Sequence, residues 1–178
     1  IGALIFDDED VQVVPAKRGK QHVINVLTEL VKKNHQLKVD SVKTNESVSL
    51  NNMLGKLQKT VKNNALIILI SDGLGWNDQS TDHLKRLRQH NEIIACHIYD
   101  PLELDLPKMS QMIVSDGVQQ IQFHSHETAI QDAYKDAMQQ QLERYSLISK
   151  KYRIPLIPID TVSTVEDQLR KALGKVMK

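Results

Sequence analysis

The stretch ALIILISDG, at residues 65–73, is the part of the chain that most constrains its fold. Its first six residues are all apolar, and the run stops at Ser71-Asp72-Gly73. A strand with one face in water alternates apolar and polar residues, whereas the strands of a parallel sheet are covered on both faces. The unbroken run therefore predicts an inner strand of a mostly parallel sheet.

The remainder of the chain alternates between strand-like and helix-like segments. This order predicts an α/β fold with a doubly wound, mostly parallel, Rossmann-like sheet and an antiparallel hairpin at one edge, in a single domain over residues 1–178. The predicted helices span residues 20–34, 49–63, 78–90, 125–152 and 163–176, and the predicted strands span residues 2–6, 11–14, 65–70, 92–99, 112–114, 119–123 and 156–159.

Short polar side chains mark the starts of the last three helices. Asp78 or Ser80, Ser125 and Ser163 are the predicted N-terminal caps, because such side chains accept hydrogen bonds from the free backbone amides of a first turn. The pair of strands at 112–123 is predicted to turn at an Asp-Gly step, residues 116–117.

The composition excludes several classes of function. The 23 Lys and Arg residues are balanced by 22 Asp and Glu, and aromatic residues make up only 4%, so no nucleic-acid partner is expected. No apolar stretch approaches the ~20 residues that span a bilayer, so we expect no membrane crossing in this segment. Because the chain begins without Met inside a predicted strand, we expect it to be the carboxyl-terminal part of a longer, cytoplasmic protein, and an upstream membrane anchor stays open.

Asp72 is the first candidate for a functional side chain. Ligands of doubly wound sheets collect at the carboxyl ends of the strands, where this residue is expected to lie. Its carboxylate, with Ser71 beside it, can hold a hard cation such as Mg²⁺, while Gly73 lets the backbone turn. The alternative is that Asp72 only caps a turn. Further metal ligands would come from Ser47 or Ser49, although either residue also suits a helix cap.

Other chemically suggestive patterns have simpler explanations. His124 and His126 have no third zinc ligand nearby, and Cys96 lies inside a predicted strand, where a thiol is a core residue. Gly55-Lys56 lacks the flanking residues of a phosphate-binding loop, and the chain contains no nucleophile elbow or dinucleotide-binding turn. None of these patterns predicts a site.

Three stretches together resemble the domain of unknown function 58 family. IGALIFDDEDVQVVPAKRGKQH, at residues 1–22, is similar to the family's strand, turn and helix entry. LIILISDGL, from residue 66, resembles its next strand with the terminal Ser-Asp. HIYDPLELDLP, at residues 97–107, matches the family's strand followed by Asp-Pro-x-Glu-x-x-x-Pro. The likeness continues through the later hairpin, long helix and closing strand and helix.

The resemblance implies a von Willebrand factor A-like domain, whose metal-ion-dependent adhesion site uses three loops. By position, Asp72 matches the Asp of the third loop, with Ser71 and Gly73 as neighbouring partner-binding residues. The second loop supplies a Thr in the family, and only Ser47 or Ser49 stands near that position here. The first loop, Asp-x-Ser-x-Ser, and its strand are absent, so the resemblance implies an N-terminally truncated domain with an incomplete adhesion site.

In a domain of that kind the absent strand lies between the counterparts of residues 1–6 and 65–70. Without it, both of these strands would have an unpaired apolar edge, which favours pairing with another strand. We therefore expect the two strands either to pair directly or to accept a strand from a second copy, which would give a homodimer through exposed strand edges.

The resemblance also implies a non-enzymatic protein–protein interaction module that works with a MoxR-type AAA+ ATPase in the assembly or activation of other complexes. In such modules Mg²⁺ bridges to a carboxylate of the partner, and we expect this metal in the full-length protein rather than in this segment. The alternative is a Mg²⁺-dependent hydrolase or phosphotransferase that uses Asp72 and Asp100. No nucleophile–base pair or phosphate loop accompanies these carboxylates, so we expect no enzyme.

Overall fold

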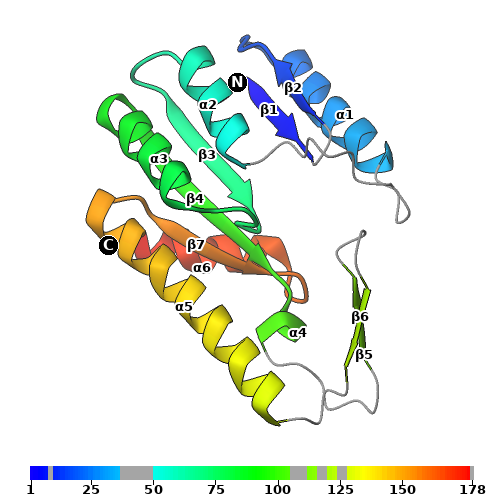
Figure 1. Cartoon of the computed structure of the whole chain (residues 1–178). Helices are drawn as coiled ribbons and strands as arrows, with labels where there is room; N and C mark the ends of the chain where they lie inside the picture. Colours follow the sequence, from blue (N-terminus) through cyan, green and yellow to red (C-terminus); the bar gives the residue numbers. More distant parts are fainter. Residues whose placement is uncertain (8–9, 37–49, 105–111, 116–119, 124–127, 177–178) are drawn as a thin grey trace.

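The structure is a computed structural model that describes residues 1–7, 10–36, 50–104, 112–115, 120–123 and 128–176 (Figure 1). The order of its elements confirms the predicted α/β class, and none of the described helices has the length and apolarity needed to cross a membrane. The strands are β1 (Ala3–Phe6), β2 (Val11–Val14), β3 (Leu66–Ser71), β4 (Glu92–Tyr99), β5 (Met112–Ser115), β6 (Gln120–Phe123) and β7 (Leu156–Asp160). The helices are α1 (Lys20–Gln36), α2 (Leu50–Thr60), α3 (Asp78–His90), α4 (Pro101–Leu104), α5 (Thr128–Tyr152) and α6 (Val165–Val176).

Three of the strands form a parallel sheet in the order β3-β4-β7. In the register, Ile68 lies beside Ile94, and Cys96 lies beside Ile157. The connection from β3 to β4 contains α3, and the connection from β4 to β7 contains α5, so helices carry the chain back between parallel strands. Because all three strands run the same way, their carboxyl ends lie at one edge of the sheet, and Asp72 follows β3 at that edge.

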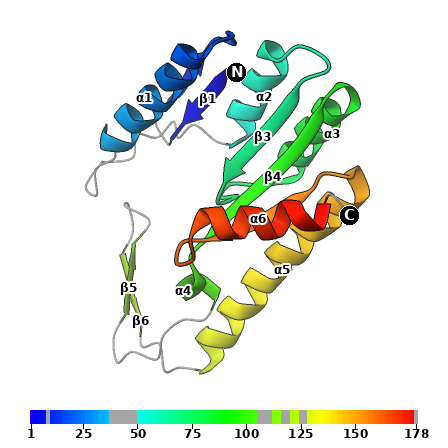
Figure 2. The same cartoon turned by 180° about the vertical axis from the view of Figure 1, so that it is seen from behind.

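Helices cover both faces of this sheet, as expected of a doubly wound fold (Figures 1 and 2). α2 and α3 pack on one face and α6 packs on the other, where it covers β4 and β7, so two-sided cover explains the apolar runs of these two strands. The core under α2 and α3 contains Leu50, Met53, Leu54, Leu84 and Leu87 against Ile67, Leu69 and Ile93, and the core under α6 contains Leu169 and Ala172 against Cys96, Ile157 and Ile159.

The start of α3 differs from the prediction. Its cap is Asn77, not Asp78 or Ser80. The Asn77 side chain accepts a hydrogen bond from the Ser80 amide at 3.2 Å, and the Ser80 hydroxyl accepts one from the Asn77 amide at 3.2 Å. Two polar side chains three residues apart satisfy two free amides in this reciprocal way, so the pair, rather than either residue alone, decides where the helix begins.

Two further helix starts also depart from the expected pattern. α6 begins at Val165, so the residue directly before the helix is Thr164 and not the predicted cap Ser163. The Thr164 hydroxyl donates a hydrogen bond to Asp167 at 2.7 Å. The short helix α4 was not predicted, although Pro101 suits a first helical position. The predicted cap of α5, Ser125, lies outside the described residues.

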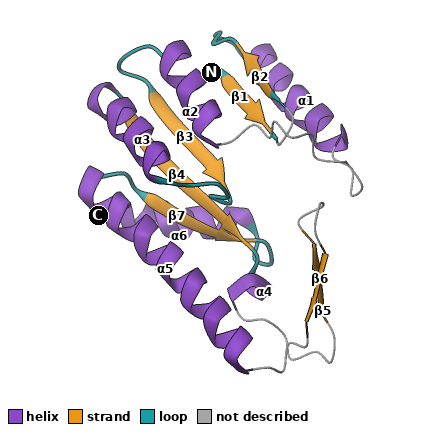
Figure 3. Cartoon of the chain, viewed as in Figure 1, coloured by secondary structure: helices purple, strands orange, loops and turns teal. Residues whose placement is uncertain are grey.

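Two antiparallel hairpins accompany the parallel sheet (Figure 3). β1 pairs with β2 and β5 pairs with β6, as predicted, while the expected Asp-Gly turn of the second hairpin lies outside the described residues. Within the described part of the chain, no strand pairs with β3 on the side away from β4, so β3 is an edge strand of this sheet and not the inner strand that its apolar run predicts. The expected direct pairing of β1 with β3 is therefore wrong. Phe6 and Val11 instead pack their side chains against the core under α2.

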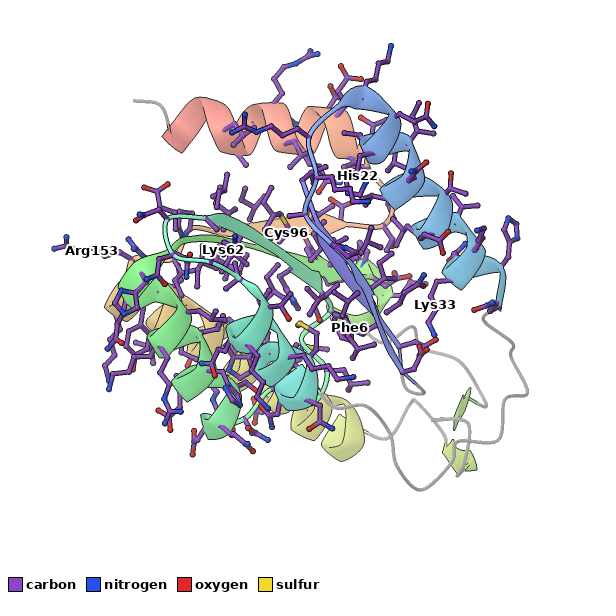
Figure 4. The ribbon with its side chains drawn as sticks, turned by 90° about the horizontal axis from the view of Figure 1, so that it is seen from above. Phe6, His22, Lys33, Lys62, Cys96 and Arg153 are labelled. Carbon is purple, nitrogen blue, oxygen red and sulfur yellow. The ribbon has the colours of Figure 1, made fainter. Side chains whose placement is uncertain are left out.

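Large apolar side chains are exposed on one face of β3. Leu66, Ile68 and Ile70 are 57%, 57% and 62% exposed. Ile68 and Ile70 lie beside Ile94 and Cys96, which α6 covers, so this exposed face of β3 is on the α6 side of the sheet. α1 lies on the same side (Figures 2 and 4) and exposes an apolar stripe of its own, formed by Val23, Ile24, Leu27, Leu30 and Val31.

Candidate functional site

Each strand of the parallel sheet has an aspartate at its carboxyl end. Asp72 follows β3, Asp100 follows β4, and Asp160 is the last residue of β7. The Oδ1 atom of each accepts a hydrogen bond from the backbone amide two residues further on, from Leu74 at 2.9 Å, Leu102 at 2.9 Å and Val162 at 3.0 Å. This is the geometry of an Asx turn. The structure therefore shows the turn-capping role that was one of the two expectations for Asp72.

Asp160 is the most fully engaged of the three carboxylates. Its Oδ1 also accepts a hydrogen bond from the Ser163 amide at 2.6 Å. The hydrogen bonds from its own turn, with the Ser163 amide foremost, lower the pKa of the Asp160 carboxyl. This aspartate therefore serves the connection from β7 to α6.

Asp72 keeps one carboxylate oxygen available while it caps its turn. The side chain is exposed, and no described residue donates a hydrogen bond to Oδ2. The Ser71 hydroxyl lies 3.4 Å from Asp72 Oδ1 and accepts a hydrogen bond from the Gly73 amide at 3.0 Å. The segment from Ser71 to Asn77, here called the Asp72 loop, thus presents a carboxylate and a hydroxyl oxygen together at the end of β3.

Tyr145 of α5 closes over the Asp72 loop at Gly73. Its buried hydroxyl donates a hydrogen bond to the Gly73 carbonyl at 3.0 Å and accepts one from Gln141 Nε2 at 2.5 Å. Burial raises the pKa of the Tyr145 phenol; the negative charge of Asp72 also raises it, and the hydrogen bond from Gln141 opposes both. A raised phenol pKa keeps the hydroxyl protonated at neutral pH, so Tyr145 remains a donor.

Aromatic rings pack against the Tyr145 ring. Trp76 and His97 both meet the Tyr145 ring edge to face, with centroids 5.4 Å and 5.1 Å away, and His97 stacks on Tyr99 at 6.0 Å. A cavity of about 40 Å³ lies between this cluster and the sheet, which is room for only a few water-sized groups. Its lining includes Leu69, Trp76, Cys96, His97, Tyr145 and Ile148.

The far end of the Asp72 loop is fastened to α2. The Ser80 hydroxyl donates a hydrogen bond to Asn51 Oδ1 at 2.6 Å, and Asn51 Nδ2 donates one to Asn77 Oδ1 at 3.1 Å. Ser80 is completely buried and Asn51 is nearly so. The loop is therefore held by α5 near its beginning and by α2 at its end.

The structure places three of the predicted site residues, Ser71, Asp72 and Gly73, together in this loop. Asp100 lies at the end of the adjacent strand. Cys96 is a buried core residue, as expected, and desolvation raises the pKa of its thiol. Among the described residues, no three His, Cys, Asp or Glu side chains are arranged to hold a metal ion. The predicted site residues Ser47 and Ser49 lie outside the described part of the chain, as do His124 and His126, for which no site is predicted.

The oxygen donors of the loop nevertheless suit Mg²⁺. This cation is commonly bound by one or two carboxylates and keeps several of its waters, so a single carboxylate with a neighbouring hydroxyl is a chemically suitable start of a site. Asp72 would hold the ion, with Ser71 beside it, and the ion would supply positive charge to attract an anionic group.

Tyr145 and Asn51 are the supporting residues that the sequence analysis missed. Tyr145 belongs to the apolar stripe of a long helix, and its loop partner is 72 positions away, so no local pattern marks it. Asn51 offered a weak signal, because it is a polar residue between the apolar Leu50 and Met53 at the start of a helix.

The chain shares its sequence pattern with one known family. The family described as "Protein of unknown function DUF58" matches residues 1–144. The chain belongs to this family. The resemblance seen in the Asp-Pro-x-Glu-x-x-x-Pro stretch and the two earlier segments is thereby confirmed.

A solved structure supports the fold of this DUF58 chain. This chain resembles the crystal structure of the conserved hypothetical protein BatB from Bacteroides thetaiotaomicron, with a TM-score of 0.51 and 10% identity. The match covers 99% of this chain and 78% of the BatB chain. At that identity the likeness shows the fold alone, which is consistent with the expected doubly wound architecture. No curated protein matches the chain.

Proposed function

We propose that this DUF58 domain is a non-enzymatic protein–protein interaction module in which Asp72 holds Mg²⁺ and the ion attracts a carboxylate of a partner protein. The observation that carries the proposal is the state of Asp72: it is exposed at the end of a sheet strand, and one carboxylate oxygen caps the turn while the other receives no hydrogen bond from a described residue. Metal binding would therefore leave the turn intact.

The support around the Asp72 loop favours a binding role. The Gly73 carbonyl is held by Tyr145, and Asn77 is held by Asn51, so the loop is fixed at both ends before any ligand arrives. A site whose donors are already in place loses less conformational entropy when it binds. For the partner, the family resemblance suggests a MoxR-type AAA+ ATPase, which is the first protein to test.

Two substitutions of Asp72 separate metal binding from turn capping. Asn keeps an oxygen that can accept the Leu74 amide, whereas Ala removes both the cap and the charge. In the intact protein we expect Asp72→Asn to keep the fold and its thermal stability but to abolish Mg²⁺-dependent capture of the ATPase in a pull-down, and Asp72→Ala to abolish capture as well. Capture that survives Asp72→Asn, or that is unchanged when EDTA removes Mg²⁺, would refute the metal bridge.

A Mg²⁺-dependent hydrolase or phosphotransferase is the second candidate, because Asp100 lies at the end of the strand beside Asp72 and caps a turn of the same kind. Asp100→Asn is the matched variant. If the protein is an interaction module, Asp100→Asn should capture the ATPase as well as the wild type does. The wild-type protein should hydrolyse no member of a phosphoester panel. Turnover that depends on Mg²⁺ and is lost in both Asn variants would identify an enzyme instead.

A further inference from the structure

We propose that Tyr145 is a positioning residue for the candidate metal site, which it controls through the peptide group between Gly73 and Leu74. The inference rests on the proposed role of Asp72 in binding. It assigns to α5, an element far from the Asp72 loop in sequence, the task of fixing where the Asp72 carboxylate points.

The coupling runs through a single planar peptide unit. The carbonyl of this unit belongs to Gly73 and accepts the Tyr145 hydroxyl at 3.0 Å. The amide of the same unit belongs to Leu74 and donates to Asp72 Oδ1 at 2.9 Å. Because a peptide group is rigid and planar, its carbonyl and its amide cannot be reoriented independently. Tyr145 therefore influences the orientation of the Asp72 carboxylate through this peptide group, without a direct hydrogen bond between the two side chains.

A second hydrogen bond strengthens the same point. The Trp76 amide also donates to the Gly73 carbonyl, at 3.1 Å, so this oxygen receives two donors. The Trp76 amide belongs to the loop and moves with it, whereas the Tyr145 hydroxyl belongs to α5. Tyr145 is thus the contact that ties this peptide to the rest of the molecule.

The Tyr145 side chain is itself firmly held. It is only 6% exposed, its ring is packed between Trp76 and His97, and its hydroxyl accepts a hydrogen bond from Gln141. On the loop side there is no spare room, because a Cβ added to Gly73 would come within 2.3 Å of the hydroxyl. The hydroxyl is therefore held against Gly73, and it holds in turn the peptide that it binds.

The competing explanation is that Tyr145 only fills the core. Tyr145→Phe separates the two roles, because Phe keeps the ring packing and removes only the donor to Gly73. The matched control is Tyr152→Phe, on the same helix, whose ring also packs against the main core. Trp76 is the only tryptophan of the chain and lies in the Asp72 loop, so its fluorescence reports on the loop directly.

In Tyr145→Phe we expect the Leu74 amide to exchange with solvent roughly three- to tenfold faster, the range that loss of one ordinary hydrogen bond allows, together with a changed Trp76 emission. Amides within β3 should keep their exchange rates, and Tyr152→Phe should leave both readouts unchanged. The inference is overturned if Tyr145→Phe leaves Leu74 exchange unaltered, or if Tyr152→Phe accelerates it equally.

A Mg²⁺ titration followed by Trp76 fluorescence tests whether the hydrogen bond from Tyr145 to Gly73 affects metal binding at Asp72. We expect the apparent Kd for Mg²⁺ to rise by roughly three- to tenfold in Tyr145→Phe and to stay constant in Tyr152→Phe. An unchanged Kd in Tyr145→Phe would refute the positioning role. If the wild-type protein binds no Mg²⁺, the proposed function fails, while the exchange rate of the Leu74 amide still decides whether Tyr145 orients the peptide.

Discussion

Two independent constraints require glycine at position 73. Its φ of +79° lies in the left-handed region, which residues other than Gly rarely adopt. The Tyr145 hydroxyl also fills the space where a Cβ would lie. Gly75, two residues further on, has a similar φ of +77° but no neighbour within 4 Å of its Cβ position. The two glycines therefore separate backbone strain from steric overlap within one loop.

We expect Gly75→Ala to lower the free energy of unfolding by about 1 kcal/mol, the usual cost of a positive φ, and Gly73→Ala to lower it by roughly 2–4 kcal/mol because Tyr145 must also move. Urea denaturation followed by Trp76 fluorescence measures both. Equal losses in the two variants would mean that the contact with Tyr145 costs little to break.

At the scale of residues, the sequence was informative wherever the signal is local. The abrupt end of an apolar run places Asp72 at a strand terminus, and the Asp72-Gly73 pair indicates a turn there. The Asx turn that Asp72 forms after β3 agrees with both expectations. The partner of Gly73 could not be predicted, because Tyr145 reaches it only after a helix has packed across the sheet. A tertiary hydrogen bond of this kind has no sequence periodicity to reveal it.

At the scale of elements, the connection between α2 and α3 depends on a small polar network in an apolar setting. Ser80 is fully buried, and its hydroxyl donates to Asn51 at 2.6 Å, whereas its other nearby acceptor, Asn77 Oδ1, is at 3.5 Å. A buried hydroxyl that loses its acceptor bears a desolvation cost that no water can offset. The network therefore stabilises the starts of both helices together.

We expect Asn51→Ala to lower the free energy of unfolding by roughly 1–3 kcal/mol, because it leaves the Ser80 hydroxyl with a poor acceptor and removes the hydrogen bond that Asn51 donates to Asn77. Lys59→Ala, at an exposed position of the same helix, should change it by less than about 0.5 kcal/mol. Chemical denaturation of both variants measures the difference. A loss in Asn51→Ala no larger than that in Lys59→Ala would show that the network contributes nothing.

The strands were predicted to within one residue at each end. The bounds of β4 agree with the prediction at both ends, because Asn91 and Asp100 stand on either side of a long apolar run. Helix starts were less certain, since Asn77, Asp78 and Ser80 are all acceptable caps and only the reciprocal bonds between Asn77 and Ser80 decide among them. Propensity narrows such a choice to a few neighbours, and the packing of the first turn settles it.

At the scale of the whole molecule, the described residues expose large apolar side chains on β3 and α1. β3 has no strand beside it on one side among the described residues, and three of its aliphatic side chains are more than half exposed. α1, which has an exposed apolar stripe, lies on the same side of the sheet (Figure 2). Single exposed apolar residues are ordinary, but a strand edge with a connected apolar face favours association.

We therefore propose that the 178-residue chain associates with a second copy through the β3 edge, the arrangement that remains of the two expected from its sequence. Sedimentation velocity over a concentration series should show a monomer–dimer equilibrium. Ile68→Lys places a charge on the exposed face of β3 and should shift this equilibrium toward monomer by at least about tenfold in Kd, because a lysine on an edge strand must be desolvated before another strand can pair there.

Leu147→Lys is the control for a general effect of hydrophobicity, since Leu147 is 67% exposed on α5, away from that edge. It should leave the equilibrium unchanged. A wild-type chain that stays monomeric at every concentration, or an equal shift in both Lys variants, would contradict pairing at β3. A dimer that forms through β3 would also leave the carboxyl edge of each sheet accessible, because strand pairing uses the side of β3 and the Asp72 loop lies at its end.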